Sequence, residues 1–231
     1  MQQDEFFATL FEIGAIQIDT RPGHGFEMRI HDTDKSAPLS PIYFNLRTSD
    51  NPKPGPLTPE LVAEIGDVLW ETAQEANIEF DGVCGIPNAG VPLAHAFYDA
   101  ALADGIELPV MTLEKEIRNG LPSFNLMDTG GLEAVNMQES RQNNIRIIDD
   151  VLTYGGTKDA AIHAVAAAGY NVTVLVFCDR QQGGAAHLLR QGITPIHAFT
   201  AVEIISVLRD IGKVSSDDAA AVLEYLEQTR A

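Results

Sequence analysis

Two adjacent acids, Asp149 and Asp150, end an apolar run and stand directly before a glycine-rich loop, in the stretch NIRIIDDVLTYGGTK. Carboxylates at the end of a strand can accept hydrogen bonds from the vicinal hydroxyls of a sugar. Successive strand residues point to opposite faces of a sheet, so the two acids are poorly placed to chelate one metal ion. We therefore expect both acids to hold a ribose.

The loop after the acids has the composition of a phosphate site, with the residues Thr153, Tyr154, Gly155, Gly156 and Thr157. Its main-chain N–H groups can form a concavity at the start of a helix, where the helix dipole also favours an anion. The order of residues matches neither Walker A nor the dinucleotide fingerprint. We predict a site for the phosphate and diol of one ribose, although an ordinary polar turn after a strand has the same composition.

The elements that position these residues follow from apolar periodicity, which alternates between strand and helix patterns. This alternation is typical of an α/β fold with a mostly parallel open sheet flanked by helices. We expect strands at 82–86, 109–113, 145–148, 171–177 and 194–198, and helices at 59–76, 91–102, 158–168 and 184–191, followed by two closing helices. Open parallel sheets bind ligands beyond the carboxyl ends of their strands, which is where the acids lie.

The chain divides into a small N-terminal accessory region, residues 1–57, and an α/β domain, residues 58–231. In the first part we expect a helix at 4–13 and extended pieces at 16–19, 26–30 and 42–46. Residues 114–143 show no strong periodicity. A loop of that length in a compact domain is usually functional, so we expect a lid.

Composition limits the partners. The formal net charge of −18 repels polyanions and argues against nucleic acid or an anionic membrane as a partner. No apolar run approaches the roughly 20 residues that span a bilayer. Cys84 and Cys178 lie in apolar strand-like runs and are expected as buried free thiols, which suits a cytoplasmic protein. The six histidines have no metal-ligand spacing, so we expect no metal site formed by the protein itself.

The acid-and-glycine segment resembles the phosphoribosyl pyrophosphate (PRPP) motif of type I phosphoribosyltransferases. Three further segments resemble the orotate phosphoribosyltransferase family in particular, and they follow in that family's order. They are SPIYFNLR at 40–47, GIPNAGVPLA at 85–94 and CDRQQGG at 178–184. One such motif could arise by chance, but four in order are a specific signal.

The resemblance implies roles for these segments. In the second segment, Pro87, Asn88, Ala89 and Gly90 would form the loop that binds pyrophosphate, although an ordinary tight turn between strand and helix has the same composition. Arg180 would bind the carboxylate of orotate with its planar guanidinium, and is otherwise a surface arginine. Tyr43 and Phe44 are candidates to stack on the base, and we expect one of them to be a core residue instead.

The implied reaction transfers the 5-phosphoribosyl group from PRPP to orotate, giving orotidine 5'-monophosphate and pyrophosphate. A magnesium ion would be held chiefly by substrate oxygens and water. Asp149 and Asp150 would hold the ribose, while Lys115 and Arg118 of the lid would neutralise pyrophosphate. In this family the lid completes the active site of the second subunit of a dimer, which implies a homodimer with shared sites.

The lid departs from the family's pattern of Arg-Lys-Glu-x-Lys-x-His-Gly. Glu114 stands where the family has arginine, Gly120 where it has histidine, and Arg118 replaces a lysine. Two alternatives therefore stay open: a phosphoribosyltransferase for another base, and a PRPP-binding regulator that performs no turnover.

Overall fold

A six-stranded sheet forms the centre of the computed structural model, which describes residues 2–32, 34–118, 121–127, 143–154 and 156–230. In spatial order its strands are β5 (Leu121–Met127), β4 (Val110–Arg118), β3 (Gly82–Gly85), β6 (Asn144–Leu152), β7 (Asn171–Asp179) and β8 (Pro195–Thr200). Every neighbouring pair is parallel except β4 and β5, which form an antiparallel hairpin. The predicted α/β class with a mostly parallel sheet is confirmed.

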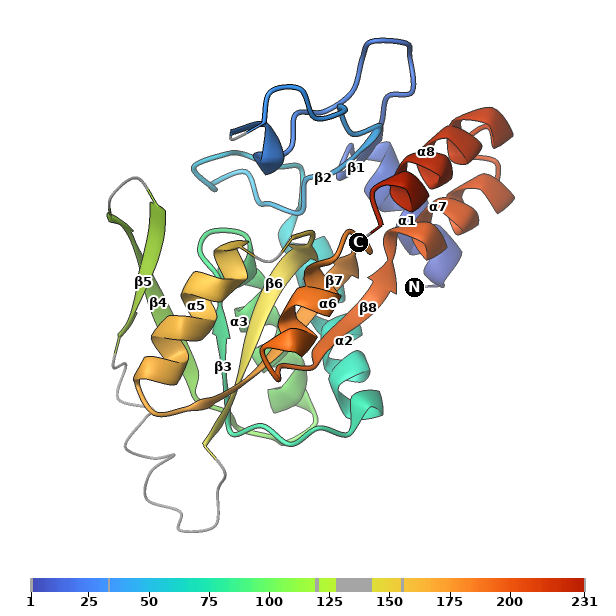
Figure 1. Cartoon of the computed structure of the whole chain (residues 1–231). Helices are drawn as coiled ribbons and strands as arrows, with labels where there is room; N and C mark the ends of the chain where they lie inside the picture. Colours follow the sequence, from blue (N-terminus) through green and yellow to red (C-terminus); the bar gives the residue numbers. More distant parts are fainter. Residues whose placement is uncertain (1, 33, 119–120, 128–142, 155, 231) are drawn as a thin grey trace.

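Helices cover both faces of this sheet (Figure 1). On one face lie α2 (Pro59–Ala76) and α3 (Gly90–Ala103), and on the other lie α5 (Gly156–Ala167) and α6 (Gly184–Arg190). The start of α2 is set by Thr58, whose hydroxyl accepts a hydrogen bond from the Leu61 N–H. Strand residues alternate between the two sides: Ile147 packs on the α5 side and Ile148 on the α3 side.

The N-terminal region lies beyond the carboxyl ends of the parallel strands, beside the two last helices (Figure 1). It contains α1 (Gln3–Glu12), the antiparallel pair β1 (Ile16–Ile18) and β2 (Ile42–Phe44), and a 3₁₀ turn, η1 (Arg29–Asp32). Helices α7 (Ala201–Asp210) and α8 (Ser216–Gln228) close the chain. The predicted extended piece at 26–30 is wrong, because only Phe26 forms an isolated bridge, with Ser40, and η1 follows.

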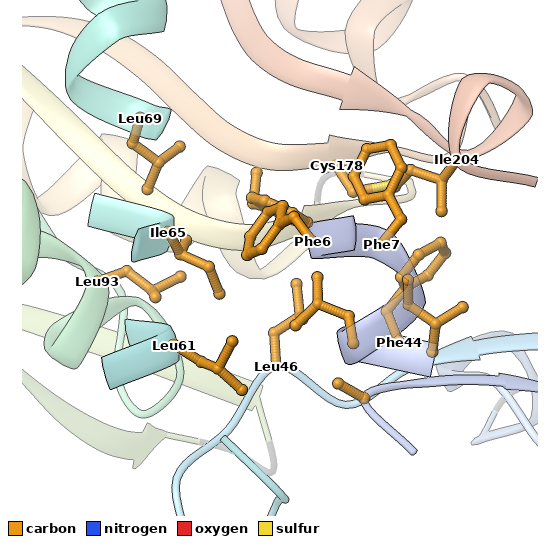
Figure 2. Packing of buried hydrophobic residues seen from close by; sticks show 14 of the residues in the cluster. Phe6, Phe7, Phe44, Leu46, Leu61, Ile65, Leu69, Leu93, Cys178 and Ile204 are labelled. Atoms are coloured by element: carbon orange, nitrogen blue, oxygen red, sulfur yellow. The ribbon is translucent and has the colours of Figure 1, made fainter. Parts of the chain in front are cut away.

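One hydrophobic core joins the N-terminal region to the α3 side of the sheet. Figure 2 shows Phe6 and Phe7 of α1 beside Phe44 and Leu46, close to Ile65 of α2. All five side chains are at most 4% exposed. This burial fixes the accessory region rigidly over the end of the sheet where the acids lie.

The predicted loop is wrong at residues 114–118 and 121–127, because β4 and β5 pair there as an antiparallel hairpin, while the role of this segment as a lid stays a prediction. Leu113 and Phe124 are buried on the α5 side, which anchors the base of the hairpin. Beyond Thr112, β4 has no pairing with β3, so its last six residues, 113–118, extend about 20 Å further at roughly 3.3 Å per residue. Residues 119–120 and 128–142 of the predicted lid lie outside the described residues.

The prediction of two buried free thiols is confirmed for Cys84 and Cys178. Over the described part of the chain, no helix combines the length and apolar character needed to cross a membrane.

Candidate active site

The site lies where the direction of the chain through the sheet reverses. From β3 the chain passes to β4 on one side, and β6, β7 and β8 then fill the other side. Because β3 and β6 are neighbours and the chain leaves them toward opposite faces of the sheet, this is the usual ligand position of an open parallel sheet. The Ile86 N–H donates to the Ile148 carbonyl at 3.0 Å and joins the ends of the two strands at this point.

The predicted pyrophosphate loop, Pro87–Gly90, packs directly against the end of β6. A Cβ atom on Gly90 would lie 2.3 Å from the Ile148 carbonyl oxygen and 3.2 Å from the Cα of Asp149. The peptide bond between Pro87 and Asn88 is cis, and α3 begins at Gly90. The loop and the acid pair are therefore in direct contact, and glycine is required at this position.

We predict that Gly90→Ala lowers the free energy of unfolding by about 1–3 kcal/mol, the usual cost of forcing a carbon atom into a packed site. The backbone at Ile148 must also move, so affinity for PRPP should fall. Thermal unfolding and calorimetric titration with PRPP measure the two effects. Gly156→Ala is the control for stability, because no described atom lies within 4 Å of its Cβ position. Equal stability of the two variants would contradict the packing argument.

The two acids have different partners. Asp149 is opposite Val176, a residue of the core on the α5 side, and it contacts Lys158 of α5. The distance from Lys158 Nζ to Asp149 Oδ2 is 2.7 Å, and both side chains are at least 90% buried. Asp150, next along the strand, accepts a hydrogen bond at 2.7 Å from the Val151 N–H on its Oδ1 atom.

Burial, and after it the charge of Asp149, raise the pKa of Asp150 to about 7. Lys158, the hydrogen bond from the Val151 N–H and Arg47 oppose this shift, because they favour the ionised carboxylate. Strong perturbation of a carboxylate is typical of functional sites.

Tyr43 and Arg47 approach the acids from the N-terminal region. Arg47 Nη1 donates to the Tyr43 hydroxyl at 2.9 Å, and the Tyr43 ring is stacked on Phe26 at a centroid distance of 5.5 Å. Arg47 also interacts electrostatically with both acids, most strongly with Asp150. Tyr43 is therefore placed beside the site, as predicted for a residue that contacts the base.

Phe44, the second stacking candidate, points the other way. It pairs with Ile16 and is buried in the core at 4% exposure (Figure 2). Neighbouring residues of a strand alternate in direction, so Tyr43 and Phe44 cannot both face the site. The prediction that Phe44 stacks on a base is corrected, and it is the core residue of this pair.

Arg180 is a buried arginine without a carboxylate partner among the described residues. It follows β7, and its main-chain N–H donates to the Leu152 carbonyl at 3.0 Å, which ties it to the acid-bearing strand. Its side chain is 1% exposed; Nη2 donates to the Ser40 hydroxyl at 2.8 Å, Nη1 lies 3.3 Å from the Met28 sulfur, and Nε has no partner in the described structure. Burial lowers its pKa.

The glycine-rich loop connects the acids to Arg180. The Thr153 carbonyl accepts a hydrogen bond at 2.8 Å from the Gly184 N–H, so the loop is joined to the start of α6. Tyr154 is 40% exposed and interacts electrostatically with Arg180. Thr157 belongs to the first turn of α5, which begins at Gly156, two residues before the predicted helix.

Of the remaining predicted site residues, Gly155 lies outside the described residues. Lys115 is exposed on β4, opposite Phe124 of β5, on the part of the hairpin that extends beyond β3. The main chain of Arg118 ends β4 three residues further on.

The sequence interpretation missed Lys158 and Arg47. Lys158 had one recognisable signal: a lysine in the first turn of a helix opposes the helix dipole and requires a local anion. Arg47 ends the quoted segment SPIYFNLR, but nothing in the sequence indicates that it faces acids about 100 residues away.

The fold and the site define an α/β protein in which an acid pair, a glycine-rich loop and a second tight loop meet where a mostly parallel sheet reverses. Comparison with protein families identifies the class: residues 57–193 match the model of the phosphoribosyl transferase domain. The chain belongs to the phosphoribosyl transferase domain family.

Two curated relatives illustrate the similarity. Uridine 5'-monophosphate synthase of Bos taurus is 26% identical over 195 residues, 84% of this chain and 36% of that protein. Orotate phosphoribosyltransferase of Sulfurisphaera tokodaii is 26% identical over 197 residues, 83% of this chain and 87% of that protein. The chain thus spans about a third of the first relative and most of the second.

Solved structures show the same fold. Leishmania donovani UMP synthase matches with a TM-score of 0.71 at 20% identity, over 99% of this chain and 43% of that one. Orotate phosphoribosyltransferase from Aeropyrum pernix matches with a TM-score of 0.62 at 20% identity, over 91% and 99% of the two chains. The N-terminal region and the α7–α8 pair lie largely within these matches, so they are part of the shared architecture.

Proposed function

We propose that this chain is an orotate phosphoribosyltransferase, which transfers the 5-phosphoribosyl group from PRPP to orotate and releases pyrophosphate. The relative from Sulfurisphaera tokodaii and the similar structure from Aeropyrum pernix are both named orotate phosphoribosyltransferase. The observation in this chain that best supports orotate as the base is Arg180, placed between the acid-bearing strand and the N-terminal region.

A buried cation without a counter-ion is costly, so it is kept where a ligand supplies the charge. Orotate carries a carboxylate that most other nucleobases lack, and a guanidinium binds a carboxylate with two parallel hydrogen bonds. Arg146 is also fully buried, and it too has no carboxylate partner among the described residues. Its guanidinium donates to the Ile78 carbonyl and the Thr173 hydroxyl and lies 4.1 Å from the Phe80 ring centre, although its Nη1 has no partner in the described structure. Arg180 differs in its place, because the described partners of its guanidinium, the Ser40 hydroxyl and the Met28 sulfur, belong to the N-terminal region.

The chain's own residues account for the chemistry of transfer. Asp149 and Asp150 accept hydrogen bonds from the ribose hydroxyls and favour positive charge that develops on the sugar as pyrophosphate leaves. Main-chain N–H groups of the loops at 87–90 and 153–156, those of Asn88 and Ala89 in the first loop, hold the two phosphate ends of PRPP, while the Gly90 N–H donates to the Ile86 carbonyl. Arg180 and Tyr43 orient the base, so that its nitrogen meets C1' as the bond to pyrophosphate breaks.

Three further features belong to the proposal. PRPP enters as its magnesium complex, in which the ion is held by pyrophosphate oxygens and water and offsets the charge of the leaving group. The protein acts as a homodimer with shared sites, in the cytoplasm, on small-molecule substrates.

A base panel tests the function. Orotate, uracil, adenine, guanine and xanthine are each supplied with PRPP and magnesium, and pyrophosphate release is measured. Release with orotate alone is the expected result. Turnover of a purine would indicate a phosphoribosyltransferase for another base, and PRPP binding without turnover of any base would indicate a regulator.

We predict that Arg180→Met raises the KM for orotate about 10- to 100-fold, because hydrogen bonds to a charged group contribute about 1.5–3 kcal/mol. The KM for PRPP should change far less. Steady-state kinetics with each substrate varied in turn measure the two constants. Arg146→Met is the matched control: it removes an equally buried guanidinium away from the site and should lower stability while leaving the ratio of the two constants unchanged. Equal effects of Arg180→Met on both substrates would make this arginine structural.

A further inference from the structure

Lys158 occupies an unusual place for a lysine. It lies in the first turn of α5, where the helix dipole disfavours a cation, and only 5% of the residue is exposed. Its ammonium group donates to Asp149 Oδ2 at 2.7 Å and to the Val151 carbonyl at 2.6 Å. Lys158 is thus directed into the protein, toward the acid-bearing strand, and is not presented to a phosphate group.

The acid pair needs such a cation. Two neighbouring carboxylates with little solvation repel each other, and one of them then tends to keep a proton. The groups that face the pair are Lys158 from α5, Arg47 from the N-terminal region and the Cys178 thiol from β7. Of the two cations only Lys158 contacts an acid directly; Arg47 instead bonds to Tyr43 and Asn45.

The contacts also decide which oxygens remain for a ligand. Asp149 uses Oδ2 for Lys158, and Asp150 uses Oδ1 for the Val151 N–H. Asp149 Oδ1 and Asp150 Oδ2 accept no hydrogen bond within the described part of the chain. A vicinal diol offers two hydroxyl donors, so one oxygen of each acid is available to it, provided that both acids are charged.

We propose that Lys158 is the positioning residue of the ribose site: it fixes one carboxylate of the acid pair and offsets its charge, so that both acids can accept hydrogen bonds from the ribose diol at neutral pH. The proposal rests on the phosphoribosyl chemistry of the proposed function. The direction of the pKa of Asp150 agrees with it, because the charge of Lys158 lowers this pKa and its removal would raise it.

The test measures PRPP binding in the presence of magnesium by calorimetry, from about pH 6 to about pH 9, for the parent and three variants. Lys158→Met keeps the unbranched side chain up to the ε position and removes the charged ammonium group. For this variant we expect the pH at which PRPP binding is half-maximal, the midpoint, to rise by about one pH unit. At pH values below the midpoints of both proteins, its affinity for PRPP should then be about tenfold lower than that of the parent. Lys158→Arg retains the charge and should retain the parent midpoint.

The third variant, Asp149→Asn with Lys158→Met, removes the ion pair as a unit. Asp150 then has no like charge beside it, so the midpoint should lie below that of Lys158→Met although one ligand for the diol is lost. If Lys158→Met does not fold and the double variant does, charge compensation of Asp149 is supported. If neither variant folds, Lys158 is a packing residue and the inference is overturned.

A uniform loss of affinity in Lys158→Met, with the midpoint of the parent, would also overturn the inference, because a purely structural role does not move a midpoint. The experiment distinguishes a failure of the proposed function from a failure of the inference about Lys158. If the parent binds PRPP but does not turn over orotate, only the assignment of the base is lost. If the parent binds no PRPP, the proposed function itself is contradicted.

Discussion

Replacing Asp150 by asparagine should nearly abolish transfer of the phosphoribosyl group and, at the same time, stabilise the unliganded protein above about pH 7. The loss of activity follows from the removal of a charged acceptor at the ribose, which costs about 2 kcal/mol or more of transition-state stabilisation, or roughly 30-fold in kcat/KM. Pyrophosphate release measured over a range of PRPP concentrations, with orotate saturating, gives kcat/KM for both proteins.

The gain in stability follows from the raised pKa. The carboxyl of Asp150 has a pKa of about 7 in the folded protein against 3.8 for an ordinary aspartate. Between these values the folded state binds the proton more tightly than the unfolded state, so this group lowers stability as pH rises from about 4 to about 7, and the cost persists above that range. Asparagine carries no such cost.

Since one pKa unit corresponds to about 1.4 kcal/mol, we expect a gain of at least about 1 kcal/mol above pH 7. For a protein of this size the gain raises the Tm by about 2 °C or more. The gain should vanish near pH 4. Thermal unfolding of the parent and the variant across this pH range measures the difference in stability between them. The titration of all other acids affects both proteins alike and largely cancels in this difference.

Asp149→Asn is the matched control, because it changes the neighbouring acid by the same substitution. It leaves Lys158 as a buried cation without its carboxylate, so it should destabilise the protein by about 3–5 kcal/mol. We therefore expect stability to rise in Asp150→Asn and to fall in Asp149→Asn, although the two substitutions are adjacent and chemically identical. A loss of stability in both variants would mean that the charge of the Asp150 carboxylate is neutralised by other groups in the folded protein.

The local part of this site was predictable from the sequence. Asp149 lies near the carboxyl end of a strand with clear apolar periodicity, the glycine-rich loop and Arg180 each follow such a strand, and the ends of parallel strands meet at one edge. Thr58 and Pro59 likewise fixed the start of α2 through local capping alone. Such features depend on neighbours within a few residues, which a sequence displays directly.

What was missed depends on contacts between distant segments. Lys115 and the acids beside it in β4 interrupt the alternation of polar and apolar residues, because beyond Leu113 the strand is paired only with β5 and is largely exposed. The sequence pattern therefore predicts a loop where the structure has a hairpin. Which of Tyr43 and Phe44 faces the site depends on the register of β2 against β1, and that pairing is not encoded within either segment.

The hairpin itself carries the last prediction. Its end lies about 20 Å beyond the part of β4 that is paired with β3, a length that allows it to reach a second molecule. If Lys115 and Arg118 neutralise pyrophosphate in the partner's site, the variant in which both are alanine should bind PRPP and be nearly inactive. Asp150→Asn should also be nearly inactive, for the different reason given above.

Mixing these two inactive proteins under conditions that exchange subunits should restore activity. Random pairing gives about half heterodimers, and each has one site with an intact Asp150 and an intact hairpin from the partner. One site in four is then complete, so pyrophosphate release should return to about a quarter of the parent value. Native mass spectrometry establishes that subunits have exchanged, and each variant alone gives the background. Exchange without recovery would place the hairpin cations in the site of their own chain, because only then does every heterodimer lack a complete site.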